Sequence, residues 1–262
     1  MERSLIYCSL LSFSLSLLFA ALISRFGLKL GLVDTPNERS SHTTIIPRSG
    51  GIGIRAAFIL TGSFFTQFQI FTILAGIVGL IGLLEDRISI SQKIRLVLIL
   101  IVSALVVSLF LGMPTSTTAV SLFLFWLLFI TGTANFYNFM DGIDGIAGLT
   151  GFVGFGFIAV FSFCIAEKSN IALISAALSV GSLGFLPFNF PKAKVFMGDV
   201  GSVLLGFVFA SFALKLSTNI STFLCIIMFM CLFYADALVT IFCRWQRGEN
   251  LIMAHKSHLY QY

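Results

Sequence analysis

Nine long apolar segments set the limits on what this chain can fold into. They lie near residues 5–24, 52–66, 68–84, 94–112, 119–134, 146–165, 170–187, 201–214 and 221–243. A helix that crosses the hydrocarbon core of a bilayer, about 30 Å thick, needs about 20 apolar residues. A transmembrane β-barrel would instead show short segments of alternating polarity. The sequence therefore predicts an all-α, polytopic integral membrane helical bundle with about nine transmembrane helices.

The composition agrees with a chain that lies mostly in lipid. Hydrophobic residues make up 58% of the sequence and charged residues only 10%, compared with about 25% charged residues in soluble domains. The net charge of +5 does not indicate a nucleic-acid partner, because the basic residues are scattered among loops that also carry acids. No linker or soluble segment interrupts the pattern, so we expect a single transmembrane domain over residues 1–262.

The charged residues are distributed unequally between the two faces of the membrane. With one reversal per span, all lysines and arginines except Arg3, Lys168 and Lys215 lie on or near one face. The positive-inside rule makes that face cytoplasmic and places the N-terminus outside. All acids except Glu2 and Glu167 lie toward the same face, which the rule does not require. We therefore expect an active face on the cytoplasmic side.

Five polar clusters on this face could carry chemistry. They are residues 34–53 with His42 and Arg48, the pair Glu85–Asp86, the stretch 138–145 with Asn138, Asp141 and Asp144, the stretch 189–202 with Asn189, Phe196 and Asp199, and the pair His255 and His258. Each cluster alone also has a structural explanation, such as a polar connector, a salt bridge at the membrane boundary or a capped helix. Asp236 lies inside the last apolar run and is a further functional candidate.

Two of these clusters predict local structure. Asn138, Asp141 and Asp144 are spaced by three residues, so on a helix they would share one face. Gly201 and Ser202 stand at the start of an apolar run, where free backbone N–H groups and the helix dipole would favour a phosphate. Asp199 beside them is suited to a hard cation such as Mg²⁺.

Together the clusters supply carboxylates for Mg²⁺ and basic groups for phosphates, as phosphoryl transfer at a membrane surface requires. A soluble phosphate donor would enter from the cytoplasm and a lipid acceptor from between the helices. Two alternatives remain open. One is an ion-coupled membrane transporter with Asp141, Asp144 and Asp236 as ion sites, and the other is a catalytically inactive membrane scaffold.

The clusters also match a known family. The motifs Asp34-x-Pro-Asn-x-Arg-x-x-His42, Glu85-Asp86, Asn138-x-x-Asp141-Gly-x-Asp144-Gly, Phe196-Met-Gly-Asp199-x-Gly-Ser202 and the terminal histidines occur in the family's order. The chain resembles the polyprenyl-phosphate N-acetylhexosamine-1-phosphate transferases (glycosyltransferase family 4), whose relatives include the phospho-N-acetylmuramoyl-pentapeptide translocase. Its C-terminal residues are most similar to the branch that initiates O-antigen synthesis, a part of lipopolysaccharide biosynthesis.

The resemblance implies a reaction in the bacterial inner membrane. UDP-N-acetylhexosamine and undecaprenyl phosphate would give undecaprenyl-diphospho-sugar and UMP, with Mg²⁺ or alternatively Mn²⁺. The implied roles are Asp199 as metal ligand, Asp141 on the diphosphate, Asp86 as the group that orients or deprotonates the lipid phosphate, and His255 and His258 near the phosphates. Asn138, Asp144, Asn189 and Phe196 would bind uridine, and Arg48 or His42 a phosphate.

The sequence departs from the family in two places. The family usually has Asp-Asp where this chain has Glu85-Asp86, so the role of Glu85 is open, although its longer side chain would still reach a metal. The family's histidine motif is usually followed by further chain, whereas this sequence ends at Tyr262, which leaves a short form or a truncated chain as alternatives. The sequence leaves open which sugar is transferred and whether the protein is a homodimer.

Overall fold

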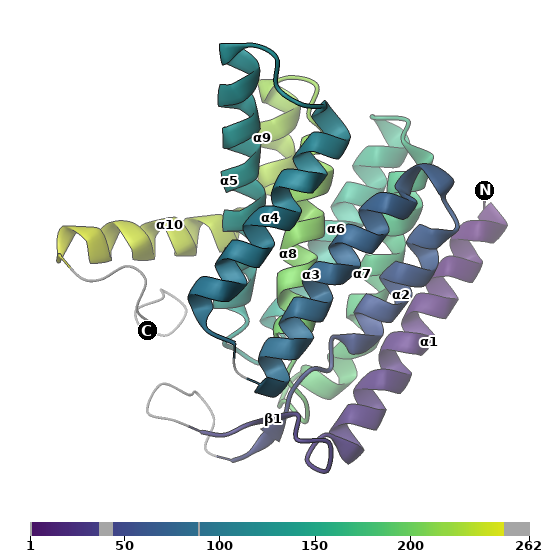
Figure 1. Ribbon diagram of the computed structural model, residues 1–262. Coiled ribbons are helices and arrows are strands. Elements are labelled where there is room, and N and C mark those ends of the chain that lie inside the picture. Colours follow the sequence, from purple (N-terminus) through teal and green to yellow (C-terminus); the bar gives the residue numbers. More distant parts are fainter. Residues whose placement is uncertain (1, 37–43, 89, 249–262) are drawn as a thin grey trace.

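The computed structural model describes residues 2–36, 44–88 and 90–248, and the side chains from Leu5 onward. Nearly all of this part is helical (Figure 1). The helices are α1 (Glu2–Phe26), α2 (Ile52–Ser63), the 3₁₀ turn η1 (Thr66–Phe68), α3 (Gln69–Ile88), α4 (Gln92–Leu111), α5 (Thr117–Met140), α6 (Ile146–Cys164), α7 (Ser169–Asn189), α8 (Asp199–Leu216), α9 (Ile220–Met228) and α10 (Cys231–Gln246). Two strands of two residues each, β1 (Val33–Asp34) and β2 (Ile46–Pro47), pair antiparallel with Val33 opposite Pro47.

The predicted membrane bundle is confirmed, but the predicted count of about nine spans is too high. Within the described residues, seven helices are long and apolar enough to cross a membrane, or up to eight if α9 and α10 together form one bent span. Helix α2 has only 12 residues, which gives a length of about 18 Å. The apolar run 221–243 is not one straight helix, because α9 and α10 meet at an angle of 89°.

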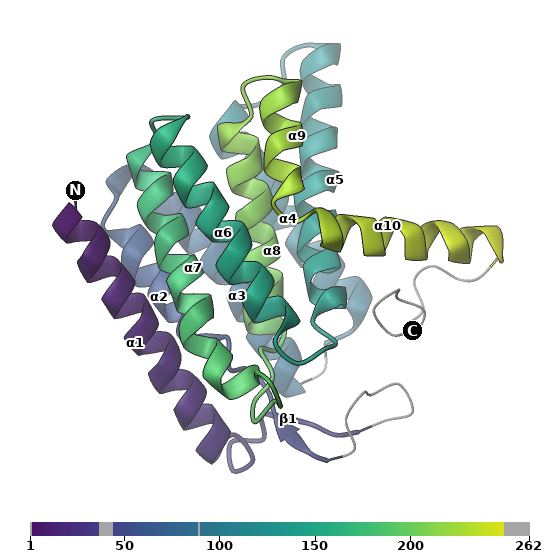
Figure 2. The ribbon, with the colours of Figure 1, turned by 180° about the vertical axis from the view of Figure 1, so that it is seen from behind.

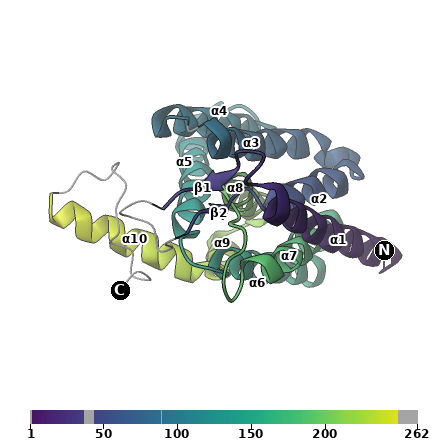
Figure 3. The same ribbon diagram turned by 90° about the horizontal axis from the view of Figure 1, so that it is seen from below.

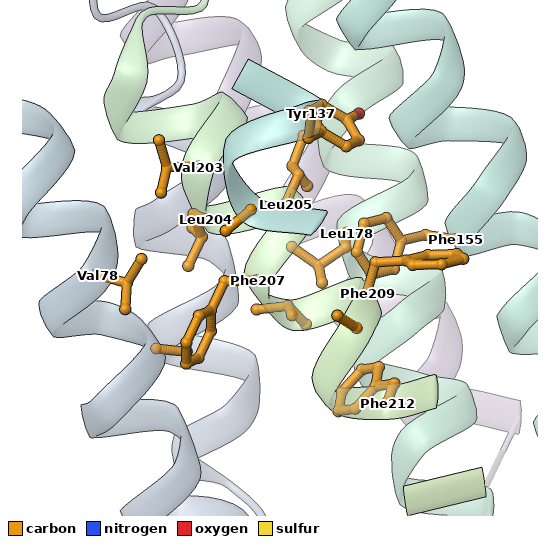
Figure 4. Close-up of a cluster of buried hydrophobic side chains, with 14 of the residues drawn as sticks. Val78, Tyr137, Phe155, Leu178, Val203, Leu204, Leu205, Phe207, Phe209 and Phe212 are labelled. Atoms are coloured by element: carbon orange, nitrogen blue, oxygen red, sulfur yellow. The ribbon is translucent and has the colours of Figure 1, made fainter. Parts of the chain in front are cut away.

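Helix α8 is the central element of the bundle. In the view from below it lies in the middle of the surrounding helices (Figure 3), and 89% of its apolar stretch is buried. A helix that is apolar on every side is stable only where neighbours cover it completely. Its side chains, among them Leu205, Phe207 and Phe209, pack between Val78 of α3 and Phe155 of α6 (Figure 4). This packing fixes the position of Asp199, the first residue of α8.

Glycines let the start of α8 approach its neighbours very closely. A Cβ atom on Gly51 would lie 2.5 Å from the Cα atom of Gly201, and one on Gly82 of α3 would collide with the backbone of Asp199 and Val200. Interiors packed at this density do not accept an extra methyl group without movement. The two glycines therefore hold α2 and α3 directly against the first turn of α8.

The connections between the described helices lie at two opposite ends of the bundle. The segments that follow α1, α5 and α7, the end of α3 and the start of α4 gather at one end of the bundle, beside the start of α8, whereas the turns after α2, α4, α6 and α8 lie at the opposite end (Figures 1 and 2). Backbone bonds join two of these segments, since the amides of Gly50 and Gly51 donate to the carbonyls of Phe196 and Met197, each at 2.9 Å. We call this the polar end of the bundle. Helix α10 turns away from the bundle to one side in both views.

Candidate active site

Asp86 lies at the centre of the polar end and is completely enclosed. Its side chain has no exposed surface, and both carboxylate oxygens accept hydrogen bonds. Oδ1 accepts from the backbone amide of Asp199 at 3.1 Å, and Oδ2 accepts from the Ser49 hydroxyl at 2.7 Å and the Val200 amide at 3.4 Å. A carboxylate at a helix N-terminus satisfies amides that have no partner within the helix and interacts favourably with the helix dipole. Asp86 therefore caps α8 and positions Asp199.

This geometry disagrees with the predicted role of Asp86 on the lipid phosphate. An acceptor phosphate cannot reach a carboxylate that has no exposed surface and whose oxygens already accept three hydrogen bonds. The sequence places two acids side by side but does not reveal that the second one points into the protein. In this structure Asp86 is a positioning residue.

The same hydrogen bonds contradict the predicted phosphate seat at Gly201 and Ser202. The first amides of α8 donate to Asp86, and the amides of Gly201 and Ser202 both donate to the carbonyl of Gly198, each at 3.1 Å. Gly198 has a φ of 74°, a left-handed conformation that glycine adopts without strain. The N-terminus of α8 is therefore already capped by protein groups, and its amides do not face an open site.

Arg48 is turned toward α3. Its guanidinium donates to the backbone carbonyls of Glu85, at 3.1 Å, and Asp86, at 2.9 Å from Nε, and it lies 3.6 Å from the carboxylate of Asp86. Carbonyls in the last turn of a helix have no partner in the helix, and a cation there is favourable. Arg48 thus caps the C-terminal end of α3. Its predicted contact with a substrate phosphate stays a prediction, and 24% of its side chain is exposed.

Glu85 and Asp199 are joined by an arginine from a third helix. Arg95, in the first turn of α4, places its Nη1 atom 3.0 Å from Glu85 Oε1 and 2.6 Å from Asp199 Oδ2. The side chain of Arg95 is only 7% exposed, whereas those of Glu85 and Asp199 are 16% and 19% exposed. Two acids that were predicted to share a site are therefore brought together, with a buried cation between them.

Asn138 lies beside this group. Its amide nitrogen donates to Asp199 Oδ1 at 2.9 Å and to the Ser202 hydroxyl at 3.0 Å. The prediction that Asn138, Asp141 and Asp144 share one helical face is wrong, because α5 ends at Met140 and both acids lie in the turn before α6. The reason is local, because Gly142 and Gly145 directly follow the two acids. Gly145 has a φ of 83°, a left-handed conformation that interrupts an α-helix.

Asp141, in the turn after α5, has a carboxyl whose charge is disfavoured by its surroundings. Removal from water raises the pKa of its carboxyl well above the ordinary range, and the negative charges of Asp199 and Asp86 raise this pKa further. A carboxyl that keeps its proton can donate a hydrogen bond to an oxygen of an anionic ligand. The predicted contact of Asp141 with a diphosphate is compatible with that protonation state.

Asn189 and Asp144 fasten two segments of the polar end to each other. Asn189 is 2% exposed, accepts from the Gly145 amide at 2.8 Å and donates to the Val195 carbonyl at 3.1 Å. Asp144 accepts from the Ala193 amide at 2.9 Å through Oδ2 and is partly exposed. Of the predicted uridine residues, Asn189 is thus buried and structural, while Asp144 and the partly exposed Phe196 have surface that a ligand can reach.

The donor set is suited to Mg²⁺, although it is not a complete cage. Among the described residues no three acid, histidine or cysteine side chains converge to hold a metal by themselves. Mg²⁺ sites commonly use one or two carboxylates and complete the shell with water and substrate phosphates. Glu85 fits this pattern, since its Oε2 atom is buried and has no hydrogen-bond partner within the described part of the chain. Asp199 and Glu85 are therefore the residues that would hold the ion.

Several residues were not recognised as site residues from the sequence. Arg95, Ser49 and Asn135 all belong to the network, and three predicted residues, His42, His255 and His258, lie outside the described residues. One signal could have identified Arg95. A cation in the first turn of a helix is opposed by the helix dipole, so its presence in an apolar helix indicates acidic partners from elsewhere in the fold.

The fold and the site define a class of protein: a polytopic membrane bundle with a cluster of ionisable side chains at one end. The chain belongs to glycosyl transferase family 4, whose model matches residues 68–217. This range holds Glu85, Arg95, Asn138 and Asp199, so the family match covers the centre of the network and not only the apolar helices.

Individual relatives agree with the family. The chain is 30% identical over 205 residues to the probable undecaprenyl-phosphate N-acetylglucosaminyl 1-phosphate transferase of Bacillus subtilis, an alignment that covers 73% of this chain and 57% of the relative. It is 33% identical over 198 residues to the undecaprenyl-phosphate alpha-N-acetylglucosaminyl 1-phosphate transferase of Thermotoga maritima, covering 73% and 60%. The Yersinia pestis protein of the same name is 30% identical, covering 79% and 60%. The chain thus aligns with about three fifths of the length of these relatives.

Proposed function

We propose that this protein transfers an N-acetylhexosamine-1-phosphate from a UDP-sugar to undecaprenyl phosphate, giving undecaprenyl-diphospho-sugar and UMP. One observation carries the proposal: Glu85, Arg95, Asn138 and Asp199, from four helices, meet at the polar end within hydrogen-bonding distance. Acids suited to Mg²⁺ beside arginines suited to phosphate are the components of phosphoryl transfer. The names of the three relatives favour UDP-N-acetylglucosamine as the donor.

In the proposed reaction the lipid phosphate itself is the nucleophile. One of its oxygens bonds to the phosphorus that carries the sugar, and the bond from that phosphorus to the bridging oxygen breaks, so UMP leaves with both electrons of that bond. The second pKa of a phosphate monoester is about 6, so the attacking oxygen is largely ionised at neutral pH. The reaction therefore needs no basic side chain, which agrees with the enclosed position of Asp86.

The exposed residues of the site divide between the two ends of the donor. Asp144 and Phe196 offer a carboxylate and an aromatic ring for the uridine, and Asp141 a proton for a diphosphate oxygen. Asp199 and Glu85 would hold Mg²⁺, which supplies charge neutralisation on the diphosphate when it is bound. The buried residues Asp86, Asn189 and Ser49 keep these groups in position.

We place the polar end on the cytoplasmic side of the bacterial inner membrane, where a soluble nucleotide sugar is available. The distribution of lysine and arginine supports this orientation. In a variant without native cysteines, Ile143→Cys at the polar end should react with a membrane-impermeant maleimide only after the cells are opened. Met113→Cys, exposed at the opposite end, should react in intact cells. The reverse pattern would refute the orientation.

The activity is tested directly by UMP release. Purified protein with undecaprenyl phosphate, Mg²⁺ and UDP-N-acetylglucosamine should form UMP, and EDTA should stop it. Asp199→Asn should remove turnover while the protein still inserts in the membrane. A panel of other UDP-N-acetylhexosamines identifies the preferred sugar, on which the assignment to O-antigen or another envelope glycan depends. No UMP from any donor would refute the proposal and leave a transporter or an inactive scaffold.

A further inference from the structure

The proposed function does not explain why Arg95 is buried between two carboxylates. Its Nη1 atom lies 2.6 Å from Asp199 Oδ2 and 3.0 Å from Glu85 Oε1, the two carboxylates suited to a divalent cation. An arginine at the protein surface would bind phosphate equally well, yet Arg95 is 5% exposed. Its place between the two carboxylates is that of a counter-ion.

A polar chain inside the bundle holds this guanidinium. Nη1 lies 3.4 Å from the side-chain oxygen Oδ1 of Asn138, and Nη2 lies 3.5 Å from Oδ1 of Asn135. Asn135 in turn donates to the Thr131 carbonyl at 2.8 Å. Asn135 and Asn138 belong to α5, whereas Glu85 belongs to α3, so two helices besides its own hold Arg95. The position of Arg95 is therefore built into the helix packing.

Both oxygens of Asp199 are already bound. Oδ1 accepts from the Asn138 amide at 2.9 Å and Oδ2 accepts from Arg95. A divalent cation that uses Asp199 must take one of these oxygens, and Oδ2 is the one held by a competing positive charge. Arg95 and a cation on Oδ2 would lie close together, and the repulsion between their like charges opposes joint occupancy.

The cluster retains unused hydrogen-bonding capacity. Glu85 Oε2 and Arg95 Nε are both buried without a partner among the described residues. An unpaired polar atom in a region of low dielectric carries a desolvation penalty. If Arg95 leaves Asp199, Arg95 Nε can donate to Glu85 Oε2, because both atoms lack a partner in the part of the chain that the structure describes. The side chain of Glu85 is one methylene longer than that of aspartate and can therefore follow Arg95.

We propose that Arg95 is an internal counter-ion that holds Asp199 Oδ2 in the substrate-free protein and must release it before a divalent cation can bind. This inference rests on the proposed function, since it concerns the cation that the reaction would use. It assigns Arg95 a regulatory role in metal loading. Binding of the cation is then opposed until Asp199 Oδ2 is free.

The test measures Mn²⁺ binding by electron paramagnetic resonance on the whole protein in nanodiscs, without substrate. Arg95→Met should lower the Kd for Mn²⁺ by about tenfold, equivalent to about 1.4 kcal/mol. The matched control is Arg87→Met, which removes the same charge from an exposed side chain close in sequence and should change the Kd less than twofold. Arg95→Lys, which keeps the charge but lacks the planar fork, should lie between wild type and Arg95→Met.

The outcomes separate this inference from the proposed function. Equal Kd values for wild type and Arg95→Met, together with Mn²⁺-dependent UMP release, would overturn the inference alone. No Mn²⁺ binding by either protein would overturn the inference and also the metal site of the proposed function. If Arg95→Met does not fold, Arg95→Lys decides, because a Kd equal to or higher than that of wild type would refute competition.

Discussion

Replacement of Asp86 distinguishes a positioning residue from a catalytic one. In Asp86→Ala the amides of Asp199 and Val200 lose their acceptor, the Ser49 hydroxyl loses its partner, and Arg48 loses the carboxylate 3.6 Å away. Leaving a buried donor without its acceptor costs about 1–3 kcal/mol, and three donors are affected, whereas the ionic partner Arg48 is partly exposed and its loss adds little. Because the Asp86 side chain has no exposed surface, water does not replace these bonds, and we expect a total loss of about 3–5 kcal/mol.

Asp86→Asn should have a smaller effect. The asparagine oxygen can still accept from the Asp199 amide, and the Ser49 hydroxyl can rotate to accept from the new NH₂ group. What is lost is the long bond from Val200, at 3.4 Å, and the extra strength that a charged acceptor gives to each remaining bond, about 1 kcal/mol. We expect a loss of stability of about 2 kcal/mol.

The assay is thermal unfolding of the purified variants in one detergent, with UMP release measured on the same samples. The order of melting temperatures should be wild type, then Asp86→Asn, then Asp86→Ala. Glu85→Gln is the comparison for melting temperature alone, because among the described residues this partly exposed neighbour pairs with Arg95. It should melt closer to wild type than Asp86→Ala, while its turnover falls because Glu85 is a proposed Mg²⁺ ligand. If Asp86→Asn melts like wild type but has lost all turnover, Asp86 is catalytic and the positioning argument is wrong.

Two further variants test the packing around the site. Asn189→Ala removes the acceptor of the Gly145 amide and the donor to the Val195 carbonyl, and should lower stability by about 2–3 kcal/mol, measured by thermal unfolding; unchanged melting would contradict the structural role. Gly51→Ala places a methyl group against Gly201 and should cost about 1–3 kcal/mol. Gly132→Ala, a helical glycine with open space around it, should be neutral or stabilising, and similar effects at both glycines would refute the close packing.

The sequence predicts the helices well because burial in lipid demands them. An apolar run of sufficient length has few alternatives to a helix, so α1 and α3 to α8 lie where the hydropathy places them. The break at residues 229–230 could not be found in this way, because both sides of it are equally apolar. The bend depends on what α9 and α10 pack against, and a one-dimensional pattern does not contain that information.

The site was predictable as a set of motifs but not as a set of contacts. Glu85, Asn138 and Asp199 do meet, as their location on one face of the membrane suggests. The contacts of the motif residues join positions that are distant in the sequence. Asp86, for example, accepts a hydrogen bond from an amide 113 positions away in the chain. Which of two adjacent acids turns inward is decided by the close approach of α3 and α8 at Gly82, a tertiary fact that local spacing does not encode.

The distribution of burial across the motifs divides the site into two parts. Three residues of the motifs are at most 2% exposed: Asp86, Asn189 and Ser49. Their side chains form hydrogen bonds with backbone groups and with one another, and they therefore fix the ends of helices. Asp141, Asp144 and Phe196 are partly exposed and retain surface for a ligand. Residues of the first kind should affect stability and turnover together, whereas replacement of Asp141 or Phe196 should affect turnover more than stability. Asp144 combines both roles, because it also accepts from the Ala193 amide. The role of a motif residue therefore depends on whether its side chain is buried among protein groups or reaches the surface. One sequence motif can contain residues of both kinds.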